Sequence, residues 1–164
     1  TGAKAIHTHE YCHNFLGIDN QPVGPDYQLR FAFPVTLERN GKSFRGFLPP
    51  LLRHITPGFV LEMMAKRMMS ASVLRIAGNA VGWAAVPEKA FFCRPLGFYQ
   101  TSAAQWELTH VPSGVCVREF DDFVPARVAL WGQKHVVSPE VYTDVDVEPG
   151  QSQSWTRRYE FEGA

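Results

Sequence analysis

The feature that most restricts how this chain can fold is the regular alternation of apolar and polar residues. Six apolar side chains occupy every second position of one segment: Tyr27, Leu29, Phe31, Phe33, Val35 and Leu37. Because successive side chains of a strand point to opposite faces, this pattern predicts a strand over residues 27–37 with one buried face. Pro34 lacks a backbone N–H and therefore removes one hydrogen bond from the predicted ladder.

Short turn sequences predict how such strands are joined. Asn40-Gly41 favours a tight hairpin turn, after which the chain returns through residues 43–48. Further turns separate the expected strands 72–77 from 80–86 at Gly78-Asn79, 105–111 from 115–120 at Pro112-Ser113-Gly114, and 141–147 from 155–161 at Pro149-Gly150. With no linker or repeat in the chain, the sequence predicts a single all-β, antiparallel domain over residues 1–164.

One segment departs from this β pattern. Four apolar residues recur there at helical spacing: Leu61, Met64, Met68 and Ala71. Thr56 fits an N-cap, and Pro57 fits the first position of a helix. We therefore expect a short helix at about residues 58–69, with its methionines filling core or interface space.

Composition excludes several classes of protein. The 16 basic and 16 acidic side chains give a net charge of zero, which argues against binding to nucleic acids or to an anionic membrane surface. We find no apolar run long enough to span a membrane and no signal peptide, so a cytoplasmic location is expected. Three widely spaced cysteines (Cys12, Cys93 and Cys116) indicate neither a disulfide framework nor a zinc knuckle.

The densest group of polar residues lies near the N-terminus. On a regular strand, one face would carry His7, His9, Tyr11 and His13, and the other would carry Thr8, Glu10, Cys12 and Asn14. Such a histidine cluster fits either a metal site or acid–base catalysis near neutral pH. Alternatively, these residues are ordinary surface histidines, an interpretation that is weaker for His13 because apolar residues follow it.

A second group surrounds Glu140. This carboxylate lies between Pro139 and a valine-rich stretch, so partial burial would raise its pKa towards the range of a general base. An exposed glutamate at a strand edge is the alternative. His135 and Trp131 are close in the sequence, and Trp131 would either stack on a ligand or fill the core.

Both ends of the chain carry distinctive stretches. The first end has Glu10-Tyr11-Cys12-His13-Asn14-Phe15-Leu16, Ile18-Asp19 and Gly24-Pro25-Asp26-Tyr27-Gln28-Leu29. The other end has Ser138-Pro139-Glu140-Val141, Pro149-Gly150-Gln151 and Trp155-Thr156-Arg157-Arg158-Tyr159-Glu160-Phe161. These stretches resemble, in the same order, the aldose 1-epimerase (galactose mutarotase-like) superfamily, whereas the middle of the chain resembles it only in its strand rhythm.

The resemblance implies a β-supersandwich of two large antiparallel sheets with a sugar on a concave face. It also implies an isomerase that interconverts α and β anomers by acid–base catalysis, without a metal or an organic cofactor. Family members are longer, so the chain resembles the C-terminal half of the family fold. The implied partners are a monosaccharide and, as a further expectation, either the missing N-terminal half or further copies of this chain.

The implied residue roles are displaced from the family pattern. The family's catalytic histidine stands four residues before an asparagine, where this chain has Glu10 before Asn14. His13 is therefore a candidate acid with Glu10 as its alternative, and Glu140 is the candidate base because Trp131 stands where the family has glutamate. The remaining candidates, all expected to bind substrate, are His9, Asn14, Trp131 and His135.

Two other functions remain open at this point. A carbohydrate-binding β-sandwich without catalytic activity would explain the tryptophan at position 131. A metal-dependent enzyme would use His7, His9 and His13, although Glu10 directly follows His9 and this spacing departs from cupin-type patterns.

Overall fold

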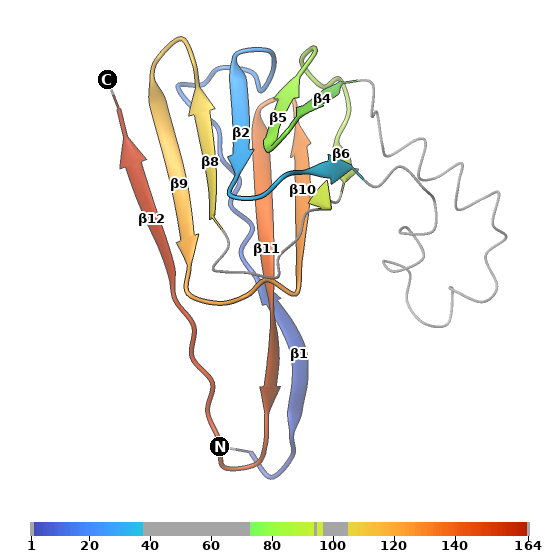
Figure 1. Ribbon diagram of the computed structural model, residues 1–164, viewed down its shortest axis with the longest axis vertical. Helices are drawn as coiled ribbons and strands as arrows, with labels where there is room; N and C mark the ends of the chain where they lie inside the picture. The colour runs from blue at the N-terminus through green and yellow to red at the C-terminus, as the bar shows by residue number, and fades with distance from the viewer. Residues whose placement is uncertain (1, 38–72, 94, 97–104, 164) are drawn as a thin grey trace, which may run out of the picture.

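The computed structural model describes residues 2–37, 73–93, 95–96 and 105–163. Within these ranges every regular element is a β-strand, and two antiparallel sheets pack face to face as a sandwich (Figure 1). The expected all-β, antiparallel sandwich is confirmed. The predicted helix at 58–69 and the Asn40-Gly41 turn lie outside the described residues. The described part of the chain has no helix long and apolar enough to cross a membrane.

The smaller sheet has four strands. Their order is β1 (Ile6–Tyr11), β11 (Val136–Val147), β10 (Arg127–Gln133) and β6 (Phe91–Cys93). The long strand β11 pairs with β10 through its first seven residues and with β1 through its last six. Beyond β1 the chain continues alongside β11, where Leu16 and Val137 exchange two backbone hydrogen bonds.

The larger sheet has six strands. Their order is β12 (Arg157–Glu162), β9 (Val115–Asp121), β8 (Gln105–His110), β2 (Tyr27–Phe31), β5 (Ala80–Trp83) and β4 (Leu74–Ala77). The β4–β5 and β8–β9 hairpins confirm two of the predicted turns. Their glycines, Gly78 and Gly114, have φ of 61° and 68°, a left-handed conformation that few other residues adopt.

The strand predicted over 27–37 is shorter in the structure. Buried and more exposed side chains alternate from Tyr27 to Phe31. A separate short strand, β3 (Thr36–Leu37), then pairs with β7 (Pro95–Leu96). Between β2 and β3, Ala32 N–H donates to Gln105 and Val35 N–H donates to the carbonyl of Gly78, outside any ladder. The interruption between β2 and β3 includes Pro34, which has no backbone N–H and so cannot continue a ladder of hydrogen bonds.

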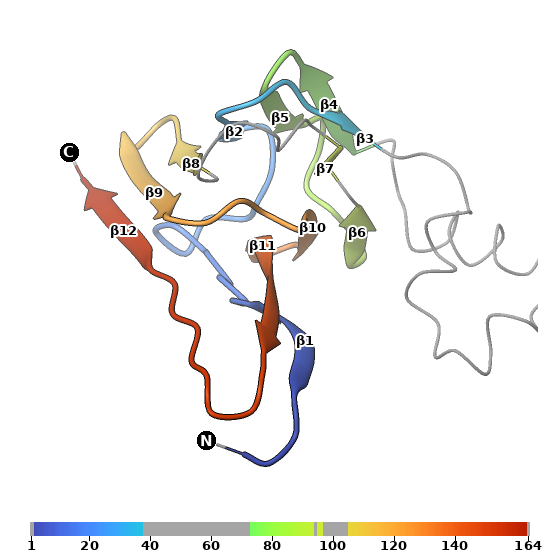
Figure 2. The same cartoon turned by 60° about the horizontal axis from the view of Figure 1, so that its bottom comes forward.

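The core lies between the two sheets. The larger sheet contributes Leu29, Val81 and Leu108, and the smaller sheet contributes Leu130 and Val137, all 0% exposed. Because side chains alternate, β11 turns its odd-numbered residues towards this core and its even-numbered residues towards the outer face of the smaller sheet. Figure 2 shows β1 and the end of β11 extending away from the sandwich.

Candidate functional site

Histidines on β1 face carboxylates on β11. Nδ1 of His7 lies 2.8 Å from Asp146 Oδ1, and Nδ1 of His9 lies 2.6 Å from Asp144 Oδ1. These pairs follow the strand register, so they share one face of the smaller sheet. The same face continues beyond the end of β1, as the sequence predicted, and ends in a third histidine–carboxylate pair.

The third pair joins His13 to Glu140. His13 Nδ1 donates to Glu140 Oε1 at 2.8 Å, and the two side chains are 51% and 3% exposed. Glu140 also accepts hydrogen bonds from the hydroxyls of Ser138 (3.3 Å) and Tyr142 (3.1 Å). A buried carboxylate needs such donors because its transfer out of water is costly. Glu140 is therefore held from three sides beneath an accessible imidazole.

The protonation of this cluster follows from its contacts. With its Nδ1 proton directed at Glu140, neutral His13 has its lone pair on Nε2, which accepts a hydrogen bond from Tyr11 OH at 3.0 Å. Burial, together with the charge of Glu140, raises the pKa of Tyr142, which therefore stays a donor. Nε2 is consequently the atom of His13 that can accept a proton from a ligand, once the ligand displaces the Tyr11 hydroxyl from it.

Aromatic rings adjoin the imidazole on the same face. Phe15 stacks on His13 with ring centroids 5.0 Å apart, and Trp131 meets Phe15 edge-on at 5.5 Å. Phe15 is 56% exposed, so most of its ring is open to solvent. We call the surface formed by His13, Phe15 and Trp131 the site face.

The backbone of Phe15 is strained. Its φ of 32° lies in the left-handed region, which is unfavourable for a residue with a bulky side chain. The neighbours on both sides hold it there, since Asn14 N–H donates to Ser138 Oγ and Leu16 pairs with Val137. Such strain costs on the order of 1–3 kcal/mol and is concentrated at functional sites.

Glu10 on β1 and Asn14, three residues beyond its end, point to the opposite face from His13, between the two sheets. Glu10 Oε2 pairs with Arg157 Nη2 at 2.9 Å. The amide of Asn14 donates to Glu119 Oε2 at 3.1 Å and to the carbonyl of Pro139, and its Oδ1 accepts from Tyr159 OH at 2.8 Å. The predicted set is thus divided, because the structure brings His13, Glu140 and Trp131 together but turns Glu10 and Asn14 inward.

Arg157 is the centre of this inner polar group. Its guanidinium contacts Glu10, Glu119 (3.4 Å) and Asp121 (3.6 Å), so three carboxylates surround one positive charge. Burial and the nearby charge of Glu119 raise the pKa of Asp121 to about 8. Sequence reasoning missed this group. One sequence feature could have revealed it: the charged residue Arg157 shares a strand face with the aromatic residues Tyr159 and Phe161.

The remaining predicted residues lie at the margins. His9 belongs to the exposed ribbon of β1 and β11, where it pairs with Asp144. His135 is exposed in the turn between β10 and β11, and its Nε2 lies 3.2 Å from Gln133 Nε2. The metal alternative does not fit this arrangement. Each histidine on β1 is paired with its own carboxylate, and the described ranges contain no group of three or more potential ligands that could hold an ion.

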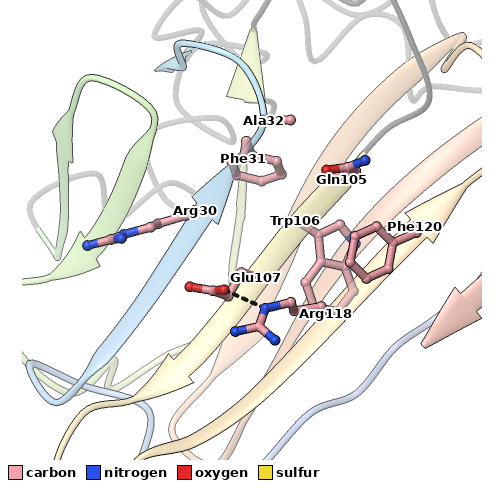
Figure 3. Close-up of a pocket in the computed structure, with 8 residues that line it drawn as sticks. All are labelled: Arg30, Phe31, Ala32, Gln105, Trp106, Glu107, Arg118 and Phe120. Carbon is pink, nitrogen blue, oxygen red and sulfur yellow. Dashed lines mark hydrogen bonds and ion pairs between the residues drawn. The ribbon is translucent and has the colours of Figure 1, made fainter. Parts of the chain in front are cut away.

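A hollow of about 390 Å³ lies on the larger sheet, and none of the predicted site residues lines it (Figure 3). It is lined by Arg30, Phe31, Ala32, Gln105, Trp106, Glu107, Arg118 and Phe120. Arg118 is already paired with Glu107 and Glu162, both at 2.7 Å, and Figure 3 shows the Arg30 side chain directed away from it. These charges do not converge on a common point, so the site face is the better candidate.

Comparisons with known proteins identify no relative. No protein-family model matches the chain, and neither a curated protein nor a solved structure shows a significant match. The resemblance to aldose 1-epimerases therefore stays a prediction from the sequence.

Proposed function

We propose that this protein binds a monosaccharide on the site face and interconverts its anomers, with His13 as the residue that exchanges a proton with the sugar. The observation that carries the proposal is the hydrogen bond from the half-exposed His13 imidazole to the buried carboxylate of Glu140, beside an exposed aromatic ring. The resemblance of the chain ends to aldose 1-epimerases supports the same reaction.

The binding chemistry follows from the side chains available. Sugar-binding surfaces combine aromatic rings, which pack on the C–H groups of a pyranose, with a few polar groups that fix its hydroxyls. Phe15 and Trp131 supply the rings. His13 and Tyr11 supply hydrogen-bonding atoms on the same face.

The proposed reaction begins when the anomeric hydroxyl replaces the Tyr11 hydroxyl at Nε2 of His13 and gives its proton to that nitrogen. The C1–O1 bond becomes a carbonyl, the C1–O5 bond breaks, and O5 receives a proton from solvent. Ring closure on the other side of the aldehyde reverses these transfers. Glu140 contacts His13 and is buried, so in this proposal it stabilises the imidazolium instead of acting as a separate base across the sugar. The mechanism uses no cofactor, and a cytoplasmic location remains a prediction.

Binding without catalysis is the second candidate. It is favoured by the exposure of Phe15 and by the inward position of Glu10, which leaves His13 as the one predicted catalytic residue that solvent reaches directly on the site face. A general acid or base typically contributes on the order of 10²–10⁴-fold to a rate, so a surface lacking a second group would anomerise sugars slowly or not at all.

Exchange NMR on a panel of aldoses tests both candidates. We expect the protein to accelerate anomer exchange for at least one sugar. His13→Gln should abolish the acceleration but retain binding, and Trp131→Ala should weaken binding measured by calorimetry. His9→Gln is the matched control, because it removes a histidine–carboxylate pair outside the site face. Binding without exchange would support the second candidate, and neither binding nor exchange would refute both.

A further inference from the structure

The larger sheet ends in a regular, unpaired edge at β12. All six residues of this strand pair with β9, and in the described part of the chain no strand pairs with its other side. Figures 1 and 2 show β12 at the rim of the sandwich. A free edge exposes a row of backbone N–H and C=O groups that can pair with another strand. Natural edges are commonly blocked by proline, by bulges or by charged side chains. Arg157–Glu162 contains no proline but carries four charged residues, so their signs decide which strand can pair with this edge.

The side chains of β12 are arranged differently on its two faces. The outer face carries three charged residues, Arg158, Glu160 and Glu162. The inner face carries Arg157, Tyr159 and Phe161, and Phe161 is 72% exposed. The edge therefore presents both unpaired backbone and an uncovered aromatic ring.

The charges match those of a second copy of the same strand. In an antiparallel pair, residues that face each other share one side of the sheet, so only registers with like faces opposed are possible. When Tyr159 lies opposite its own copy, Arg158 lies opposite Glu160 of the partner, and this contact occurs twice. Within one chain Arg158 and Glu160 already form an ion pair at 2.6 Å, so the dimer would contain a compact group of four alternating charges.

Neighbouring registers are unfavourable for the same reason. Centring the pair on Arg158 places two arginines opposite each other. Centring it on Glu160 places two glutamates opposite each other, which offsets the two Arg158–Glu162 contacts of that register. Centring it on Phe161 places Glu160 opposite Glu162. Like charges directly opposite each other destabilise a strand pair, so the charge pattern selects the register centred on Tyr159.

We propose that β12 pairs antiparallel with β12 of a second copy, about a two-fold axis at Tyr159, so that the two six-stranded sheets join into one. On the inner face, Phe161 then lies opposite Arg157 of the partner, and the two Tyr159 rings are side by side. Such an interface is self-complementary, as a closed dimer requires. The proposal is independent of the function assigned to the site face.

Charge reversal with mixing tests this interface on the full 164-residue chain, by sedimentation equilibrium over a range of concentrations. The unsubstituted protein should dimerise, with a dissociation constant that rises with salt. Arg158→Glu places like charges opposite in each of the registers above, so it should weaken dimerisation roughly tenfold or more. Glu160→Arg does the same in the register centred on Tyr159 and should weaken that pairing likewise. An equimolar mixture of the two variants should dimerise again, because positions 158 and 160 are then both acidic in one chain and both basic in the other.

The double variant Arg158→Glu/Glu160→Arg should also dimerise, since it exchanges the charges without changing their complementarity. Arg75→Glu on β4, at the opposite edge of the sheet, is the control and should leave the association unchanged. A protein that stays monomeric throughout would overturn the proposal. So would a dimer that tolerates both single reversals, or a mixture that shows no recovery. Recovery in the mixture also shows that both variants are folded.

Discussion

His13 Nδ1 donates a hydrogen bond to Glu140 Oε1 at 2.8 Å, although the two residues are 127 positions apart in the chain. The pair exists because β11 lies next to β1 and to the segment that follows β1. One partner is nearly buried and the other is half exposed. The buried carboxylate thus fixes the orientation of an imidazole that solvent can reach, as the proposed proton transfer requires.

Glu140→Gln should disturb both stability and the state of His13. An amide offers one acceptor oxygen and one donor group to the three donors that now converge on the carboxylate. One buried polar group is then left unsatisfied, so we expect a loss of about 1–3 kcal/mol in the free energy of unfolding. Nitrogen NMR should show a change in the His13 tautomer. Asp144→Asn, at an exposed pair, should change stability by less than about 0.5 kcal/mol.

Asn14→Ala should be among the more damaging single substitutions. It removes the partner of Tyr159 OH, of Glu119 and of the Pro139 carbonyl, and each is part-buried at that contact. Leaving a buried polar group unpaired costs about 1–3 kcal/mol, so urea denaturation should show a loss of at least that size. His9→Ala on the exposed ribbon is the control. Equal effects of the two variants would contradict the inner position of Asn14.

Asp121→Asn should change how stability depends on pH. The pKa of Asp121 is raised from 3.8 to about 8 by burial and by Glu119. The folded state thus binds this proton more tightly than the unfolded chain. Its contribution to stability is complete below the unfolded pKa and is lost as the pH rises through the folded pKa. As the pH rises from about 4 to about 8, the variant should therefore gain stability relative to the unsubstituted protein.

Asp122 is the control, because its pKa is shifted in the opposite direction to that of Asp121. Hydrogen bonds from Thr156 lower the pKa of Asp122, so its contribution to stability is present at neutral pH and is lost in acid. Asp122→Asn should therefore show no trend relative to the unsubstituted protein between neutral and alkaline pH. A similar trend for both variants would contradict the assignment of the effect to Asp121.

Gly17→Ala should destabilise the chain just beyond the site face. A Cβ atom at this position would lie 2.7 Å from the backbone oxygen of His135, so the main chain itself must move. Overpacking of this kind costs about 1–3 kcal/mol. Gly82→Ala is the matched control, because a Cβ there meets nothing within 4 Å. Thermal unfolding should show a lower midpoint for the first variant only.

Phe31→Ala tests the core position predicted from alternation. Phe31 is 3% exposed, so removing its ring leaves a cavity and should cost about 3–5 kcal/mol. The same substitution at Phe161, which is 72% exposed, should cost much less in dilute protein. Denaturant melts of the two variants compare these positions directly. A small loss at Phe31 would place its ring outside the core.

Local patterns predicted much of the candidate site as well as the strands. The period of two placed His13 on the face of His7 and His9, and placed Asn14 on the opposite face, as the structure has them. The same period separates Glu10 from His13, so the two could not have shared one site on a regular strand. Glu10 is a candidate acid only through the family resemblance, as the alternative to His13. Arg157 escaped notice because its partners Glu119 and Asp121 come from β9.

By itself, the sequence determined the β class, the two hairpins at Gly78 and Gly114, and the faces on which side chains lie. These properties depend on neighbours a few residues apart, whose spacing is fixed by the backbone. Only the tertiary structure decided that β11 lies between β1 and β10, and hence that Glu140 meets His13 while Glu10 meets Arg157. Strand order depends on how distant apolar faces are buried together, and no local pattern encodes that choice.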